Sequence, residues 1–68
     1  MSASTFHRFV FALESAKAAA EGAIKHADRG DAHGLSTADA YLLALQRRVH
    51  EARELLDDMK RECKSQTT

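Results

Sequence analysis

The sequence predicts an all-α fold: an antiparallel helical hairpin of two long helices that dimerises into a four-helix bundle. Three observations lead to this fold class: each half of the 68-residue chain carries a heptad row of apolar residues, one break separates the halves, and proline is absent. Apolar residues at alternating steps of three and four share one face of a helix. Two such faces can cover each other, so residues 1–68 are predicted to form a single helical-hairpin domain.

The first helix is expected over about residues 5–29, where an alanine-rich composition favours helix. Its apolar row consists of Phe6, Phe9, Leu13, Ala16, Ala20, Ala23 and Ala27. Lys25, His26 and Arg29 suit the negative end of the helix dipole. Gly30 is expected in the left-handed conformation that commonly follows the last turn of a helix.

A loop is expected at residues 30–35 because Gly30 and Gly34 lie close together there. Ser36 can then cap a second helix over about residues 36–64, with Asp39 completing a variant of the capping box. The apolar row of this helix consists of Ala38, Leu42, Leu45, Val49, Ala52, Leu56, Met59 and Cys63. Residues 65–68 are expected to form a disordered tail. A short loop makes the helices antiparallel, so the numbers of facing residues should add up to about 65.

The chain is expected to be a homodimer, because a domain of this length buries too little apolar surface to be comfortably stable alone. Cys63 is the only cysteine, which excludes an intrachain disulfide and a cysteine-built zinc site. Oligomerisation is left, and six large apolar residues within the two predicted helices lie outside the rows. We expect these six to form a dimer or partner interface: Val10, Phe11, Ile24, Tyr41, Leu43 and Leu55.

The sequence contains no constellation of residues that predicts catalysis. The four histidines are scattered, and none forms the Glu-x-x-His or His-x-x-x-His pair that builds metal sites on helices. There is no glycine-rich phosphate loop and no nucleophile with a neighbouring base. We therefore expect no enzyme activity, no cofactor and no metal site.

Charge and hydropathy limit the partners that the chain can attract. Ten basic and ten acidic residues cancel, so no net field draws in nucleic acid or an anionic membrane. No apolar run reaches the roughly 18 residues that a membrane span needs, and no secretion signal is visible. A cytoplasmic protein without membrane contact is expected. An alternative polar binding face, suited to structured RNA, is the cluster Arg47, Arg48, Glu51 and Arg53, but interleaved acidic residues argue against nucleic acid as a partner.

The function we expect is that of a small dimeric regulatory or inhibitory module, which binds a larger protein through exposed apolar helix faces. Phe11 and Leu43 are the expected anchors, and a phage- or mobile-element-encoded inhibitor of a host regulator is one form that such a module takes. Two alternatives are a structured-RNA-binding regulator and a small secretion or assembly chaperone. In architecture the chain is similar to the plasmid primer-repressor hairpin, which dimerises and binds paired RNA loops, and to short co-chaperones of type III secretion needle proteins. Only the helical plan is shared, because no motif is common to these proteins and the chain.

Overall fold

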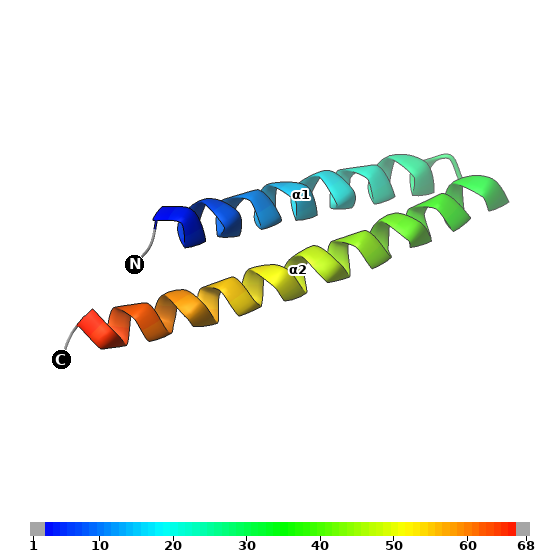
Figure 1. Cartoon of the computed structure of the whole chain (residues 1–68). Coiled ribbons are helices and arrows are strands. Elements are labelled where there is room, and N and C mark those ends of the chain that lie inside the picture. The colour runs from blue at the N-terminus through cyan, green and yellow to red at the C-terminus, as the bar shows by residue number, and fades with distance from the viewer. Residues whose placement is uncertain (1–2, 67–68) are drawn as a thin grey trace.

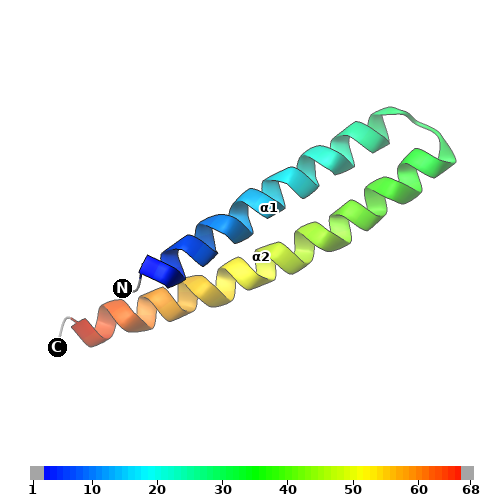
Figure 2. The ribbon, with the colours of Figure 1, turned by 45° about the horizontal axis from the view of Figure 1, so that its top comes forward.

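The computed structural model describes residues 3–66, which form two α-helices joined by a short turn (Figure 1). Helix α1 spans Ala3–Asp28 and helix α2 spans Ala32–Gln66. The two helices run antiparallel and side by side, so that the start of α1 and the end of α2 lie at the same end of the hairpin (Figure 2). The predicted all-helical hairpin is therefore confirmed.

The end of α1 follows the prediction closely. Gly30 has a φ of 73°, in the left-handed region, and its amide donates a hydrogen bond to the carbonyl oxygen of Ala27 at 3.1 Å. Because glycine has no Cβ, it adopts this conformation without the steric cost that other residues incur. The chain then turns within a few residues into α2.

The beginning of α2 differs from the prediction, because this helix starts at Ala32 and not at Ser36. The Asp31 carboxylate accepts a hydrogen bond from the amide of Gly34 at 2.6 Å, as an N-cap residue does. The predicted capping box of Ser36 and Asp39 is therefore wrong, since both residues lie inside the helix.

Gly34 is part of the first turn of α2 and is buried there. A Cβ at this position would lie 2.5 Å from the carbonyl oxygen of His26 and 2.8 Å from Oδ1 of Asp31. The glycine therefore allows the start of α2 to pack against the end of α1, which is why a residue that predicts a loop lies in a helix.

The end of α2 also lies beyond its predicted limit. Ser65 and Gln66, which were expected in a disordered tail, continue the helix. Residues 67–68 of that expected tail lie outside the described residues, as do residues 1–2.

The core between the helices is built mainly from alanine. The buried apolar residues are Ala12, Ala16, Ala19, Ala23, Ala38, Ala52, Leu55 and Met59. Ala12, Ala52 and Leu55 form the centre of this core, and Phe9 packs against them. The numbers of Ala12 and Ala52 add up to one less than the predicted sum for facing residues, as do those of Phe9 and Leu55, so the predicted register is nearly right.

Only half of each predicted apolar row lies between the helices. In α2, Ala38, Ala52 and Met59 are buried as expected, but Leu42, Val49 and Leu56 are exposed. The side chains one position earlier take their places in the contact, so that Arg48 is half-buried and Leu55 is only 4% exposed. The expectation that Leu55 lies in a dimer or partner interface is therefore corrected: this residue belongs to the core of the hairpin.

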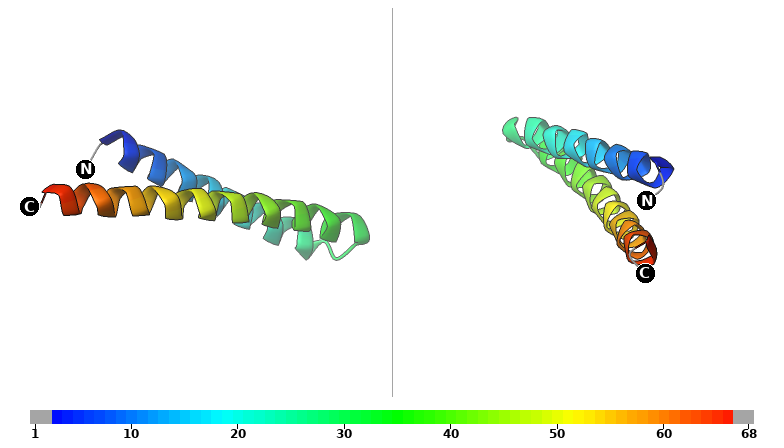
Figure 3. Two further views of the ribbon diagram at one scale, coloured as in Figure 1. Left: turned by 60° about the horizontal axis from the view of Figure 1, so that its bottom comes forward. Right: turned by 90° about the vertical axis from the view of Figure 1, so that its left-hand side faces the viewer.

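On α1, too, some of the side chains that face the other helix are not those of the predicted row, and the physical reason is clear. Phe6 and Leu13 are exposed, whereas Ala12 and Ala19 are buried. A strip of alanines gives α2 a smooth surface against which it can pack closely, whereas Phe6 and Leu13 would hold the helix axes apart. The two helices cross each other along their length (Figure 3).

The hairpin is a long, thin molecule. Its Cα atoms extend over 56 × 14 × 12 Å and have a radius of gyration of 15.9 Å. A compact domain of this length has a radius of gyration of about 11 Å. Neither α1 nor α2 contains an apolar stretch of the length and hydropathy that crossing a membrane requires.

Candidate interaction surfaces

Most of the large apolar side chains of the hairpin face outward. Among residues 3–66, Leu55 and Met59 are the only large ones that are buried. Five exposed residues form what we call the apolar face, and they are exposed by between 40% and 46%: Phe6, Leu13, Leu42, Val49 and Leu56. Isolated exposed apolar residues are normal on proteins, but a contiguous set marks an interaction surface.

Helix geometry brings these five residues to one side of the hairpin. Leu13 and Leu56 each follow a core residue by one position, Ala12 and Leu55 respectively. The other three lie at multiples of seven residues from these two and therefore on the same faces of their helices. One position turns the side chain by about 100° in the same sense around each helix axis. Because α1 and α2 are antiparallel, this turn leads to the same side of the hairpin on both helices.

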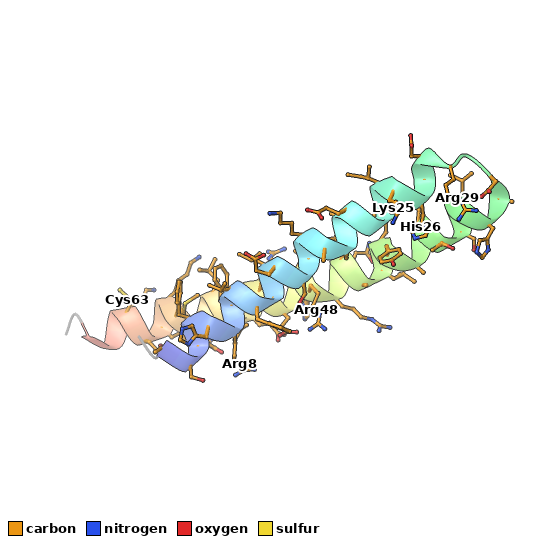
Figure 4. The ribbon with its side chains drawn as sticks, turned by 90° about the horizontal axis from the view of Figure 1, so that it is seen from above. Arg8, Lys25, His26, Arg29, Arg48 and Cys63 are labelled. Carbon is orange, nitrogen blue, oxygen red and sulfur yellow. The ribbon has the colours of Figure 1, made fainter. Side chains whose placement is uncertain are left out.

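Further apolar side chains extend the apolar face. Cys63 follows Leu56 by one heptad on α2 and is exposed. On α1, Val10 and Ile24 lie at its outer edge, and Ile24 is 71% exposed. Figure 4 shows that Cys63 points to the opposite side of the hairpin from Arg8 and Arg48. One side of the hairpin is therefore apolar along most of its length.

The opposite side carries a shallow groove near the N-terminus of α1. The groove is lined by Ser4, His7, Arg8, Phe11 and Glu51, of which Phe11 is 63% exposed. The side chains of Glu51 and Arg48 form an ion pair at 3.2 Å beside it. The first expected partner anchor, Phe11, thus lies on the other side of the molecule from the apolar face.

The remaining predicted interface residues lie apart from Phe11. Leu43 is exposed on the outer side of α2, turned away from α1 by its helical position. The ring of Tyr41 stacks on His26, with 5.4 Å between the ring centroids, and therefore belongs largely to the hairpin contact. Phe11 and Leu43 do not form one surface within a single chain.

The alternative polar binding face does not form a single basic patch. Arg48 is engaged with Glu51, whereas Arg53 lines a separate hollow beside Val49. The spacing of Arg47 and Arg53 places them on different sides of α2. These residues therefore do not converge on one ligand in the isolated hairpin.

The apolar face could have been found in the sequence by noticing that two rows overlap. The row of residues 38, 45, 52 and 59 can be completed by residues 42, 49 and 56 or by residues 41, 48 and 55. The second choice includes Arg48, so apolar patterning favours the first. The hairpin contact uses residues 41, 48 and 55, which leaves residues 42, 49 and 56 exposed on the surface.

The described part of the chain shows no metal-binding cluster: residues 3–66 contain no group of three or more His, Cys, Asp or Glu side chains placed to hold an ion. Comparison of the chain with protein-family models, with curated proteins and with solved structures found no match. A function must therefore be proposed from the two surfaces alone.

Proposed function

We propose that the chain is a homodimeric protein-interaction module whose two hairpins pack through the apolar face into a four-helix bundle. The observation that carries this proposal is the exposure of Phe6, Leu13, Leu42, Val49 and Leu56 along one side of the hairpin. A second copy supplies a surface of the same length and the same apolar character. An isologous contact between identical faces is the commonest way in which proteins form dimers.

The direction of the predicted rows supports a bundle of four helices. Two stripes of α2 share residues 38, 45, 52 and 59. The stripe completed by residues 42, 49 and 56 points about 50° further away from α1 than the stripe completed by residues 41, 48 and 55. In a square bundle, the stripe that faces the common core lies about 45° from the line to each neighbouring helix. The heptad rows thus point where the centre of a four-helix bundle would lie, and one hairpin covers only half of each row.

The surface area of the hairpin supports association as well. The chain has an accessible surface of 5172 Å², whereas a compact monomer of its mass has about 4,250 Å². The excess is roughly 900 Å², which is close to the roughly 800 Å² that each partner buries in an interface of standard size. A dimer through the apolar face would bring the exposed area to the range of compact proteins.

The dimer would leave Phe11 and its groove free for a larger protein, and binding such a protein as a regulator or inhibitor is the biological role that we propose. An exposed aromatic residue beside arginine is typical of the side chains that dominate protein interfaces. We place this role in the cytoplasm, where the single cysteine would stay reduced.

The proposed dimer can be tested by placing a charge on each of two exposed apolar positions. Val49→Asp puts a carboxylate in the middle of the apolar face, whereas Leu43→Asp puts the same group on the outer side of α2. We expect light scattering coupled to gel filtration to give the mass of a monomer for Val49→Asp and of a dimer for Leu43→Asp. Equal masses for both variants would contradict the assignment of the face.

The proposed partner site needs a separate experiment. Phe11→Ala should leave helicity and the dimer intact but weaken the partner complex by about 1–3 kcal/mol, as the loss of an interface anchor does. Leu43→Ala is the matched control on the other exposed surface. Equal loss of the same captured partner in both variants would contradict a site centred on the groove of Phe11.

A further inference from the structure

We infer that the two hairpins pack with their turns at opposite ends, so that each α2 lies antiparallel to the α2 of the second copy; this inference rests on the proposed dimer. Its starting point is a polar row on α2 beside the apolar face. The row recurs every seven residues and consists of Asp39, Gln46, Arg53 and Lys60. Gln46 and Arg53 line the same hollow as Val49, which places this row along the edge of the apolar face.

The charges of this row are separated along the helix. Its acid, Asp39, lies near the turn, and its bases, Arg53 and Lys60, lie toward the open end of the hairpin. Within residues 3–66, none of these three side chains has an ion-pair partner, whereas Arg48 pairs with Glu51 and His50 pairs with Glu54. The row is therefore free to pair with charges on another molecule.

An antiparallel pair of α2 helices matches these charges. Val49 is the midpoint of α2, which spans Ala32–Gln66. If the two-fold axis passes near Val49, Asp39 lies level with the partner's Lys60, and Gln46 lies level with the partner's Arg53. The same register places Leu42 beside the partner's Leu56, so that apolar residues meet along the centre and opposite charges meet at the edge.

The register also suits the sizes of the side chains on α1. The apolar residues of this helix become smaller toward the turn, from Phe6 and Leu13 to Ala20. With the turns at opposite ends, Phe6 lies beside the partner's Ile24, and Ala20 lies beside the partner's Val10. Large residues are thus distributed along the bundle, as even packing requires.

The other symmetric arrangement of the same faces has both turns at one end, and it pairs α2 with the partner's α1. In that arrangement Arg53 lies beside the partner's Val10, and Asp39 lies beside the partner's Ile24. Charges would then lose water without gaining a partner, which is unfavourable. The two Phe6 side chains would also crowd one end of the bundle. The order of the charges along α2 and of the side-chain sizes along α1 therefore favours an arrangement with the turns at opposite ends.

The single cysteine allows this arrangement to be measured by pulsed electron paramagnetic resonance with a spin label on Cys63. Cys63 lies fourteen residues from Val49, so turns at opposite ends predict labels about 40 Å apart. Turns at the same end predict labels about 15 Å apart, the diagonal of a four-helix bundle. The long distance supports the inference, and the short distance overturns it while leaving the proposed dimer standing. A label on Lys64→Cys in the Cys63→Ser background, on the outer side of α2, repeats the measurement away from the apolar face.

Charge reversal provides the second readout. Asp39→Lys should weaken the dimer about tenfold, because two symmetric pairs become repulsive, and adding Lys60→Asp should restore the dissociation constant. Asp57→Lys makes the same charge change on the outer side of α2 and should leave the dissociation constant unchanged. Failure of the double reversal to restore binding overturns the paired register. Absence of any dimer in the unaltered chain would contradict the proposed function itself.

Discussion

Two glycines in this hairpin lie where a side chain would collide with a neighbouring group. At Gly22, a Cβ would lie 2.6 Å from Cε1 of Tyr41, whose ring covers the α1 backbone. At Gly34, the nearest group is the backbone carbonyl of His26. The two positions therefore differ in how readily the structure can respond, because an aromatic ring can move more easily than a helix backbone.

The close approach of Tyr41 leads to a first prediction about Gly22. Replacing glycine by alanine inside a helix normally raises the free energy of unfolding by about 1 kcal/mol. In the unaltered chain we expect Gly22→Ala to give no such gain, because the new methyl group displaces the ring of Tyr41. In a Tyr41→Ala background the full gain should return. Thermal denaturation of the four chains of this double-mutant cycle measures the difference, and equal gains in both backgrounds would show that the ring does not pack there.

A second prediction concerns the residue that caps α2. Asp31→Ala removes the carboxylate that accepts the hydrogen bond of Gly34, and it should lower the free energy of unfolding by about 1 kcal/mol. Asp31→Asn keeps an acceptor and should cost much less. Ser36→Ala, the change at the cap that the sequence suggested, should be neutral or slightly stabilising. Urea unfolding compares the three variants, and a larger loss for Ser36→Ala would return the helix start to Ser36.

At the scale of the helix, two neighbouring leucines of α2 have different surroundings. Leu55 is buried against Ala12 and Ala52, whereas Leu56 lies on the apolar face. Leu55→Ala should therefore destabilise the hairpin itself by about 2–5 kcal/mol, the usual cost of truncating a buried leucine. Leu56→Ala should act mainly by weakening the dimer.

Concentration separates these two effects. Melting of the Leu56→Ala variant should approach that of the unaltered chain as the protein concentration rises, because mass action favours the dimer. The Leu55→Ala variant should remain less stable at every concentration. If the two variants behaved alike, the distinction between hairpin contact and apolar face would be wrong.

The sequence predicted the helices better than their rotation. The heptad rows and the conformation of Gly30 follow from local patterns, so both helices, the antiparallel hairpin and nearly the right register could be predicted. Gly34 misled the prediction because its need for space depends on the carbonyl of His26, which only the folded chain brings near. The apolar rows misled it because the pattern does not distinguish a stripe that faces the other helix of the hairpin from a stripe that lies on its surface.

The candidate surfaces were predicted only in part. Val10, Phe11, Ile24 and Leu43 are exposed, in agreement with their positions outside the predicted rows. Leu55 was misplaced because its neighbour Leu56 fits the apolar pattern equally well. The heptad pattern identifies the members of the apolar face, but it does not show that they lie outside the hairpin contact, since that depends on how closely the alanines of α1 allow α2 to approach.

For the whole molecule, the central claim is that the apolar face is covered by a second copy. Sedimentation equilibrium of the unaltered chain at micromolar concentrations tests it most directly. We predict a single species with twice the mass of the 7.5 kDa chain, which dissociates and loses helix together as the solution is diluted. A monomer that stays folded and unfolds cooperatively at the same micromolar concentrations would contradict the claim.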